Sequence, residues 1–242
     1  MTAGQLLERY ARVIEKLEVA CSACGRRREE VTLIAVSKLH PADAVATLAG
    51  AGHLDFGENY VQEAFAKREK LEGDALSRNV RWHMIGHVQS RKAALVAGAF
   101  VLVHSLDSRK LADGMERRLA ALKATQPVLI EVNVGGEAQK SGVMPSDLPA
   151  LADYVRERCP HLELRGLMCL PPVFDAGDAA RPHFARLRVL AEALRDRLGL
   201  PLPELSMGMS GDFPGAVAEG ATMVRIGTDI FGARPYSNFG AA

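Results

Sequence analysis

Eight short apolar or β-branched runs alternate with amphipathic helical stretches along this chain, and no other feature limits its fold as strongly. The runs cover 31–38, 54–59, 81–86, 100–106, 127–134, 163–170, 204–210 and 223–230. The helical stretches include 42–52, 60–72, 109–124, 147–158 and 179–198, and a further amphipathic helix precedes the first run. Strict alternation favours parallel βαβ units. Eight such units fit a closed barrel better than an open sheet, so we predict an α/β fold, a (β/α)8-barrel of the TIM type with an extra N-terminal helix.

The length of the chain agrees with this fold. Its 242 residues are close to the ~250 of a typical (β/α)8-barrel. At 48% hydrophobic and 24% charged residues, the composition is that of an ordinary globular domain. No Pro/Ser-rich linker divides the chain, and few residues follow the last predicted strand. We therefore expect residues 1–242 to form one domain, with no second domain.

Charge and cysteine content argue against several function classes. A net charge of +1 gives no electrostatic footprint for nucleic acid or an anionic membrane surface. No apolar run approaches the ~20 residues of a membrane span, and the N-terminal helix carries charges throughout, unlike a signal peptide. Four cysteines suggest no disulfide framework, so we expect a cytoplasmic protein. We interpret Cys21 and Cys24 as small residues near a helix end, not as a redox or zinc motif.

Strand parity separates side chains that face the barrel lumen from those that face the helices. The apolar face of 127–134 should meet the helices, which turns Glu131 and Asn133 inward. In the last strand the same reasoning turns Arg225 inward. Sites in this fold lie at the carboxyl ends of the strands. We therefore expect one mouth to gather Lys38, Asn59, Ser210, Gly227 and Thr228, with Arg225 just below and Ser206 in the same strand as Ser210.

Lys38 is a candidate for attack on an aldehyde, because a lysine at the end of a barrel strand can lose its proton in a partly desolvated pocket near another cation. Arg225 would be that cation. The plain alternative for Lys38 is a solvated surface charge. For Arg225, an inward guanidinium needs an acceptor. A pyridine nitrogen would serve, and so would Glu131 through an internal ion pair; both interpretations stay open.

Two glycine-containing turns follow the seventh and eighth strands. Residues 206–213 offer the hydroxyl of Ser210 before a helix that should begin near 212–214, and residues 225–232 offer Gly227 and Thr228. Phosphate binding between these two loops recurs in the fold. The alternative is that both turns are only tight corners of the barrel.

Two further pairs of side chains invite a functional interpretation that we do not favour. His83 and His87 stand four apart, but they lie at a predicted strand end and lack the glutamate of a zinc-protease motif. Asp55 and Glu58 fall on opposite faces of a strand, which argues against a glycosidase pair. We therefore predict no metal site.

Taken together, seven ordered segments resemble the YggS/PROSC family of pyridoxal phosphate homeostasis proteins, over almost the whole chain. They are IAVSKLHP, FGENYVQEA, WHMIGHVQSRK, VHSLDS, EVNVGGEAQKSG, RGLMCLPP and LSMGMSGDFPGAVAEGATMVRIGTDIFGAR. The resemblance implies that Lys38 carries pyridoxal 5′-phosphate (PLP) as a Schiff base and that Arg225 faces the pyridine nitrogen. It also implies that Ser210, Gly227 and Thr228 hold the phosphate. Asn59, His83 and Ser206 complete the cofactor-binding set that we assign.

The resemblance extends to the barrel domain of alanine racemases without the second domain of those enzymes. It implies a monomeric carrier that binds, buffers and delivers PLP, with transient contacts to PLP-dependent apo-enzymes and no catalytic residue of its own. The main alternative is a racemase, lyase or transaminase of low activity on a small amino acid, with Lys38 as base and Tyr60 or His83 as second group. A third candidate is a cofactor-free Schiff-base aldolase on the same fold.

Overall fold

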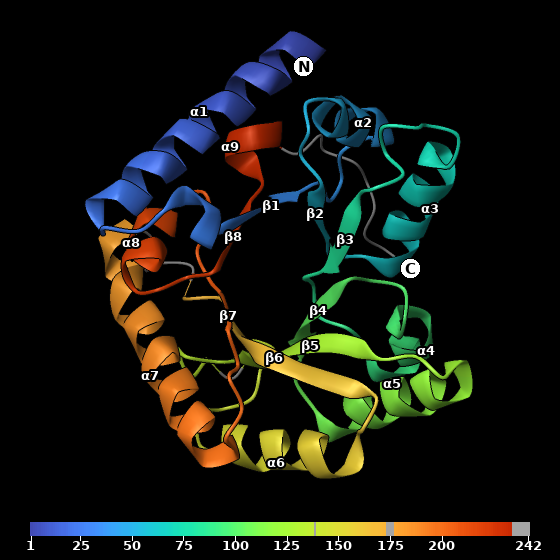
Figure 1. Cartoon of the computed structure of the whole chain (residues 1–242), viewed down its shortest axis with the longest axis vertical. Helices are drawn as coiled ribbons and strands as arrows, with labels where there is room; N and C mark the ends of the chain where they lie inside the picture. The colour runs from blue at the N-terminus through green and yellow to red at the C-terminus, as the bar shows by residue number, and fades with distance from the viewer. Residues whose placement is uncertain (138, 173–176, 234–242) are drawn as a thin grey trace.

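The computed structural model describes residues 1–137, 139–172 and 177–233. Eight parallel strands close into a barrel in the order of the sequence (Figure 1). They are β1 (Thr32–Val36), β2 (Asp55–Glu58), β3 (Arg81–Met84), β4 (Leu102–Leu106), β5 (Gln126–Val132), β6 (Leu162–Cys169), β7 (Glu204–Ser206) and β8 (Met223–Ile226). Closure occurs between β1 and β8, where Ile34 lies beside Arg225. The predicted (β/α)8-barrel is confirmed.

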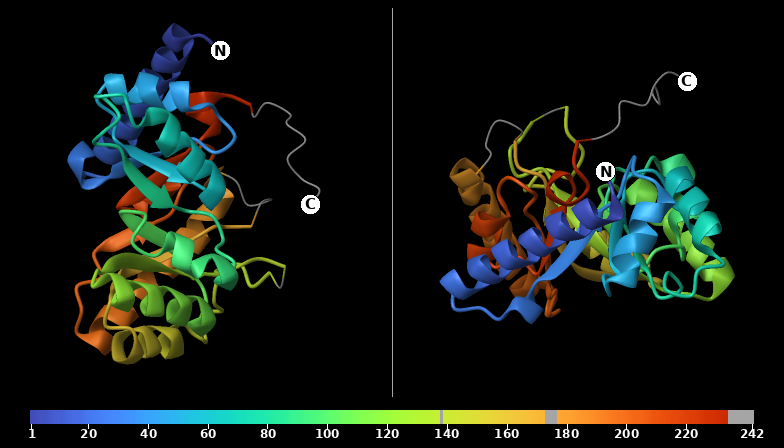
Figure 2. Two further views of the ribbon diagram at one scale, coloured as in Figure 1. Left: turned by 90° about the vertical axis from the view of Figure 1, so that its right-hand side faces the viewer. Right: turned by 90° about the horizontal axis from the view of Figure 1, so that it is seen from above.

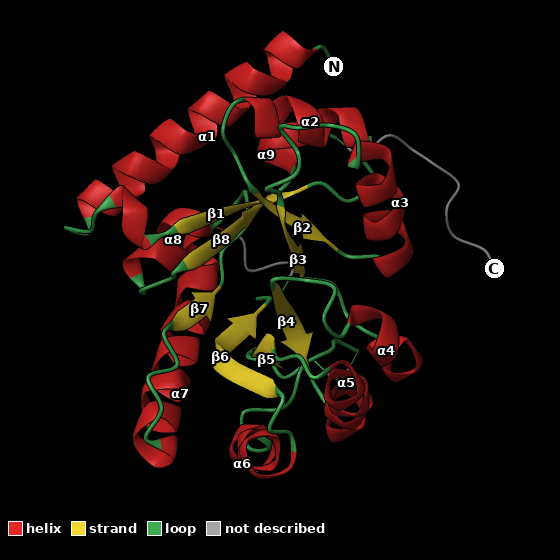
Figure 3. Cartoon of the chain, turned by 45° about the vertical axis from the view of Figure 1, so that its right-hand side comes forward, coloured by secondary structure: helices red, strands yellow, loops and turns green. Residues whose placement is uncertain are grey.

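Helices surround the barrel, as Figure 3 shows by colour. They are α1 (Ala3–Ala23), α2 (Ala42–Gly50), α3 (Val61–Leu71), α4 (Ala93–Val96), α5 (Arg109–Leu122), α6 (Leu148–Arg158), α7 (Arg181–Leu198), α8 (Phe213–Ala218) and α9 (Thr228–Phe231). Short 3₁₀ turns lie at Arg28–Glu30, Ser90–Lys92 and Gly177–Ala180. No helix in the described ranges has the length and apolar character needed to cross a bilayer.

The extra N-terminal helix α1 packs outside the ring. A capping box of Thr2 and Gln5 starts it, and a buried apolar stripe that includes Leu6, Val13 and Leu17 faces the molecule. The helix runs across α8, α9 and α2 (Figures 1 and 2). It therefore covers the junction at which the first and last strands meet.

The barrel wall separates two apolar layers, as strand parity predicts. The lumen holds Ile34, Leu102, Leu129, Met168 and Met223. The helix-facing layer is larger and includes the predicted outer face of β5, namely Val128, Ile130, Val132 and Val134. Side chains on each strand thus alternate between a small inner core and the main core under the helices.

The predicted strands extend too far at the mouth. β7 ends at Ser206 and β8 at Ile226, whereas the sequence pattern predicts that both strands continue for four more residues. Gly208 adopts φ +94, a conformation that favours glycine and breaks the strand. After Gly227 the chain enters the single turn of α9, so these apolar residues pack as a short helix. The expected helix near 212–214 is α8.

The two cysteines of the C-x-x-C segment lie at the end of α1. Cys21 is buried and Cys24 is exposed, and both thiols are free. No group of three or more His, Cys, Asp or Glu side chains suited to a metal ion occurs among the residues described.

Candidate functional site

Lys38 lies in a turn directly after β1, at the carboxyl end of the barrel, and is partly exposed. The amide of Ser37 continues the ladder by donating to the carbonyl of Gly57 at 3.1 Å. The amide of His40 then donates back to the carbonyl of Ser37 at 3.0 Å, which closes the turn. Leu39 within it adopts φ +63, an uncommon conformation for a residue with a side chain.

Arg225 enters the lumen from β8, beside β1, and is 3% exposed. Its Nη1 donates to Ser206 Oγ at 2.6 Å and its Nη2 to the Cys169 carbonyl at 2.8 Å. Burial lowers the pKa of this guanidinium. Glu131 accepts instead from Ser141 Oγ at 2.8 Å, and no ion pair joins it to Arg225 in the described part of the chain. The interpretation in which Glu131 pairs directly with Arg225 is therefore wrong.

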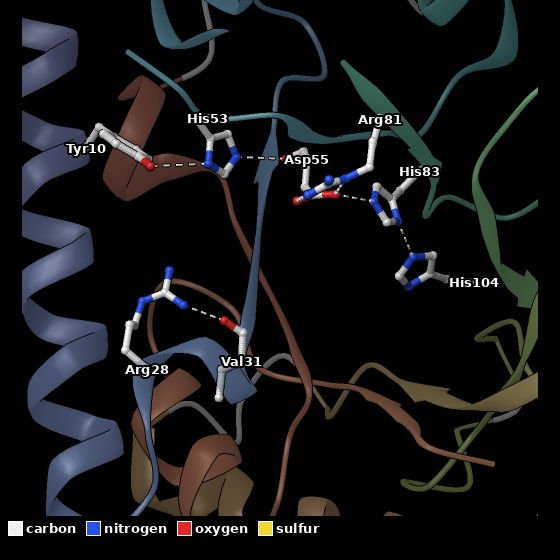
Figure 4. Close-up of polar contacts among 8 residues, drawn as sticks. All are labelled: Tyr10, Arg28, Val31, His53, Asp55, Arg81, His83 and His104. Carbon is white, nitrogen blue, oxygen red and sulfur yellow. Dashed lines mark hydrogen bonds and ion pairs between the residues drawn. The ribbon is translucent and has the colours of Figure 1, made fainter. Parts of the chain in front are cut away.

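From Ser206 a chain of hydrogen bonds crosses the lumen. Ser206 Oγ lies 2.9 Å from His104 Nδ1, and His104 Nε2 lies 3.0 Å from His83 Nδ1. His83 Nε2 lies 3.1 Å from Asp55 Oδ1. Figure 4 shows the hydrogen bonds that link His104, His83 and Asp55. We call this series, from Arg225 to Asp55, the lumen chain.

The donors of the lumen chain can be assigned in one direction. A guanidinium only donates, so Ser206 accepts from Arg225 and its own hydroxyl proton points to His104 Nδ1. His104 then donates from Nε2 to His83, which donates in turn to the carboxylate of Asp55. Every member but the first accepts from its predecessor, so the lumen chain fixes both histidine tautomers.

Electrostatics agree with that assignment. Burial holds the pKa of His104 well below its usual value, and nearby His83 and Arg225 lower it further, so His104 stays neutral. For Asp55, burial alone would raise the pKa, but hydrogen bonds from Arg81 and His83 outweigh it and lower the pKa far below the ordinary range. The lumen chain thus runs from a buried cation to a firmly ionised carboxylate.

The turns after β7 and β8 come together as the sequence predicts. The amide of Asp229 donates to Ser210 Oγ at 3.3 Å, which places Ser210 beside the first turn of α9. A Cβ on Gly227 would lie 3.4 Å from the carbonyl oxygen of Val36, so Gly227 packs closely against the end of β1. The two turns and the Lys38 turn therefore share one edge of the barrel.

Arg9 of α1 supports the turn after β8 from outside. Its guanidinium donates to the carbonyls of Thr228, Asp229 and Ile230 at 2.7, 3.0 and 3.2 Å. The Thr228 carbonyl also accepts from the amide of Gly232 at 2.9 Å, so Arg9 adds a second donor there and supplies donors to the two carbonyls that follow. Arg9 therefore fixes the backbone that carries Thr228.

Asn59 follows β2 and lies under Gly86, where an added Cβ would come within 2.6 Å of Asn59 Cα. Its Oδ1 is buried and has no hydrogen-bond partner among the described residues. An orphaned buried acceptor is costly unless a ligand satisfies it.

The chain matches the family model described as the alanine racemase N-terminal domain over residues 13–235. Its sequence is 46% identical to the pyridoxal phosphate homeostasis protein of Pseudomonas aeruginosa, over 96% of each chain. The protein of the same name from Aquifex aeolicus is 42% identical over 95% of this chain and 98% of its own length. This chain belongs to the family of pyridoxal phosphate homeostasis proteins.

Solved structures of other proteins have the same fold. PipY of Synechococcus elongatus, solved with PLP bound, superposes with a TM-score of 0.80 at 36% identity and covers 94% of this chain and 100% of PipY. PipY without PLP gives a TM-score of 0.83. The alanine racemase of Corynebacterium glutamicum shares only the fold, with 17% identity, a TM-score of 0.66 and 62% of its own chain covered.

Sequence reasoning missed part of this site. His104 and Asp55 of the lumen chain were not among the predicted residues, although parity on β4 and β2 turns both inward. His83 was included, and the structure places it within the lumen chain, hydrogen-bonded on both sides. The hydroxyl of Ser206 is likewise hydrogen-bonded on both sides, to Arg225 and to His104.

Proposed function

We propose that this chain binds pyridoxal 5′-phosphate at the barrel mouth and acts as a carrier in PLP homeostasis, with Lys38 as the covalent tether. The observation that carries the proposal is the arrangement at one edge of the barrel. The Lys38 turn, the buried cation Arg225 and the two turns after β7 and β8 meet where β1 pairs with β8. The names of the homeostasis-family relatives and PipY with PLP bound support the same ligand.

The side chains at the mouth fit the groups of this cofactor. The cofactor supplies an aldehyde that a lysine amine attacks reversibly. We assign the attack to Lys38: a C–N bond forms, the carbonyl oxygen leaves as water, and added water reverses the reaction. Arg225 is protonated at all relevant pH values, so it would donate to the pyridine nitrogen and keep that nitrogen unprotonated.

Phosphate binding falls to the turns after β7 and β8. Ser210 and Thr228 offer hydroxyls, and the backbone amides near Gly227 can point at an anion. Asn59 Oδ1 is an acceptor for a donor on the ring, which would satisfy this buried atom. We therefore propose Lys38, Asn59, Ser210, Arg225, Gly227 and Thr228 as direct contacts, with His83 and Ser206 acting through the lumen chain.

A carrier fits these residues better than a racemase or lyase does. An unprotonated pyridine nitrogen is a weaker electron sink than one paired with a carboxylate. His83 is engaged on both ring nitrogens, and Tyr60 is 54% exposed at the rim, where water competes for its hydroxyl. We further propose a single domain over residues 1–242, a monomer in the cytoplasm, and transient contacts with apo-enzymes.

The test is an absorbance spectrum of protein mixed with PLP, before and after borohydride reduction. We expect a visible band that is lost on reduction, with the modified residue mapped to Lys38. Lys38→Ala should abolish the band, whereas Lys70→Ala, an exposed lysine on α3, should leave it unchanged. A wild-type protein that takes up no cofactor, or a band that survives Lys38→Ala, overturns the proposal. Lys38-dependent deuterium exchange at the α-carbon of amino acids would favour the enzymatic alternative.

A further inference from the structure

A buried ionic cluster lies behind the Lys38 turn, between the barrel wall and α3. Lys67 Nζ lies 2.6 Å from Glu58 Oε1 and 2.7 Å from Glu63 Oε1. Ser37 Oγ donates to the same oxygen of Glu58 at 2.6 Å. We call Ser37, Glu58, Glu63 and Lys67 the Lys67 cluster; none of its members faces the lumen, because Ser37 and Glu58 occupy the outer parity of β1 and β2.

Burying these charges carries a cost that needs an explanation. Glu58 is fully buried and Lys67 is 5% exposed. Burial raises the pKa of Glu58, and Lys67 opposes that rise. A buried ion pair rarely stabilises a fold more than apolar side chains of the same volume would. Stability alone therefore does not account for a lysine at this position of α3.

The Lys67 cluster holds the backbone on both sides of Lys38. Before it, Lys67 Nζ donates to the carbonyl of Ser37 at 2.6 Å. After it, the amide of Leu39 donates to Glu63 Oε1 at 2.5 Å. Leu39 is in the left-handed conformation, which is unfavourable for a residue with a Cβ. The bond to Glu63 offsets part of this cost and retains the turn.

We infer that Lys67 is a positioning residue for Lys38, and that it fixes the turn so that the Lys38 amine meets the cofactor aldehyde. The two bonds hold the carbonyl before Lys38 and the amide after it, so they fix the backbone from which the Lys38 side chain extends. The inference rests on the proposed function and deepens it. We assign Lys67 no contact with the cofactor; it acts through Glu63 and the carbonyl of Ser37.

The test compares two ligands that differ only at the reacting carbon. PLP carries the aldehyde, whereas pyridoxine 5′-phosphate carries an alcohol and binds through its ring and phosphate alone. In Lys67→Met we expect the rate of formation of the visible band with PLP, and the affinity for PLP, to fall about tenfold or more, as for other small misplacements of a reacting group. The affinity for pyridoxine 5′-phosphate should stay within about twofold of wild type. A merely structural loosening would weaken both ligands alike.

Three further variants complete the experiment. Lys70→Met, an exposed lysine on the same helix, should behave as wild type, and Lys67→Arg should recover part of the rate because it keeps the charge. Glu58→Gln with Lys67→Met removes one charge of each sign, so it keeps the net charge of the cluster and guards against failure of the single variant to fold. This double variant should also lose PLP selectively.

The outcomes separate the inference from the proposed function. Absence of a Lys38 adduct in wild type refutes the proposed function. A wild-type adduct with unchanged rate and PLP affinity in Lys67→Met, or in the double variant, overturns the role of Lys67 and leaves the proposed function standing. An equal loss of both ligands also overturns it, since it identifies Lys67 as a structural residue only.

Discussion

The hydroxyl of Ser206 joins Arg225 to His104 in the lumen chain. Ser206→Ala tests how much these two hydrogen bonds contribute to the free energy of unfolding. The substitution removes one oxygen from a fully buried position and adds no volume. It leaves Nη1 of Arg225 without its acceptor and Nδ1 of His104 without its donor. Both are buried, so water cannot replace the lost partner without opening the barrel.

The expected cost follows from the two bonds. A hydrogen bond to a charged group contributes about 1.5–3 kcal/mol and a neutral one about 0.5–1.5 kcal/mol, so Ser206→Ala should lower the free energy of unfolding by about 2–4 kcal/mol. Ser105 provides the matched control. It is also fully buried, but its Oγ makes one neutral bond, to the carbonyl of Gly86 at 2.6 Å. Ser105→Ala should cost only about 1 kcal/mol.

Urea unfolding of the three proteins, followed by circular dichroism at neutral pH, measures both costs in the same way. The order wild type, Ser105→Ala, Ser206→Ala is expected in the unfolding midpoints. Equal midpoints for the two variants, or a smaller loss in Ser206→Ala, would refute the assignment of a strong hydrogen bond from the charged Arg225 to Ser206. Ser206→Ala should also bind PLP more weakly, because Arg225 loses one of the two contacts that aim it.

Two remaining predictions concern pH and backbone packing. Burial lowers the pKa of His104 and keeps its ring neutral in the folded chain. In the unfolded chain the same ring binds a proton below pH ~6.5. The free energy of unfolding is therefore unaffected by His104 above that pH and decreases as the pH falls below it. Between pH 7.0 and 5.5 protonation of His104 in the unfolded chain should lower the free energy of unfolding by about 1 kcal/mol. Urea unfolding at both pH values should therefore show a pH-dependent loss that is smaller by this amount in His104→Gln than in wild type. An equal loss in the two proteins would contradict the burial of a neutral ring. Gly166→Ala should destabilise the protein by about 3 kcal/mol, because its Cβ would lie 1.9 Å from the Glu204 carbonyl oxygen. Gly73→Ala is the control, since open space surrounds that glycine, and it should be neutral. Thermal unfolding of both variants measures the difference.

The barrel can be predicted from the sequence because each strand has a clear face. On β5, for example, every second residue from Val128 is apolar and packs under the helices. The same parity turns Arg225 into the lumen, where the structure has it. The alternation of apolar and polar residues along a strand can be read from the local sequence without knowledge of the other segments. The inward orientation of Arg225 is therefore predictable.

Contacts between distant segments could not be predicted in the same way. His104 meets Ser206 across 102 residues, and the direction of that bond depends on Arg225 occupying the other side of the hydroxyl. The Lys67 cluster depends on the rotation of α3 about its axis, which sets whether a lysine meets β2 or water. The prediction of a direct Arg225–Glu131 ion pair is wrong for a related reason. Ser206 Oγ and the Cys169 carbonyl, which belong to other strands, accept the hydrogen bonds of Arg225 instead.

The contacts of Arg9 also bear on the order in which the protein can be completed during synthesis. Arg9 is synthesised 219 to 221 residues before the carbonyls that it holds. The pairing of β1 with β8 spans almost as much of the chain. The ribosome must therefore synthesise β8 and α9 before the turn after β8 can be braced by Arg9. A nascent chain that has not yet reached α9 should therefore be unable to hold PLP at this mouth.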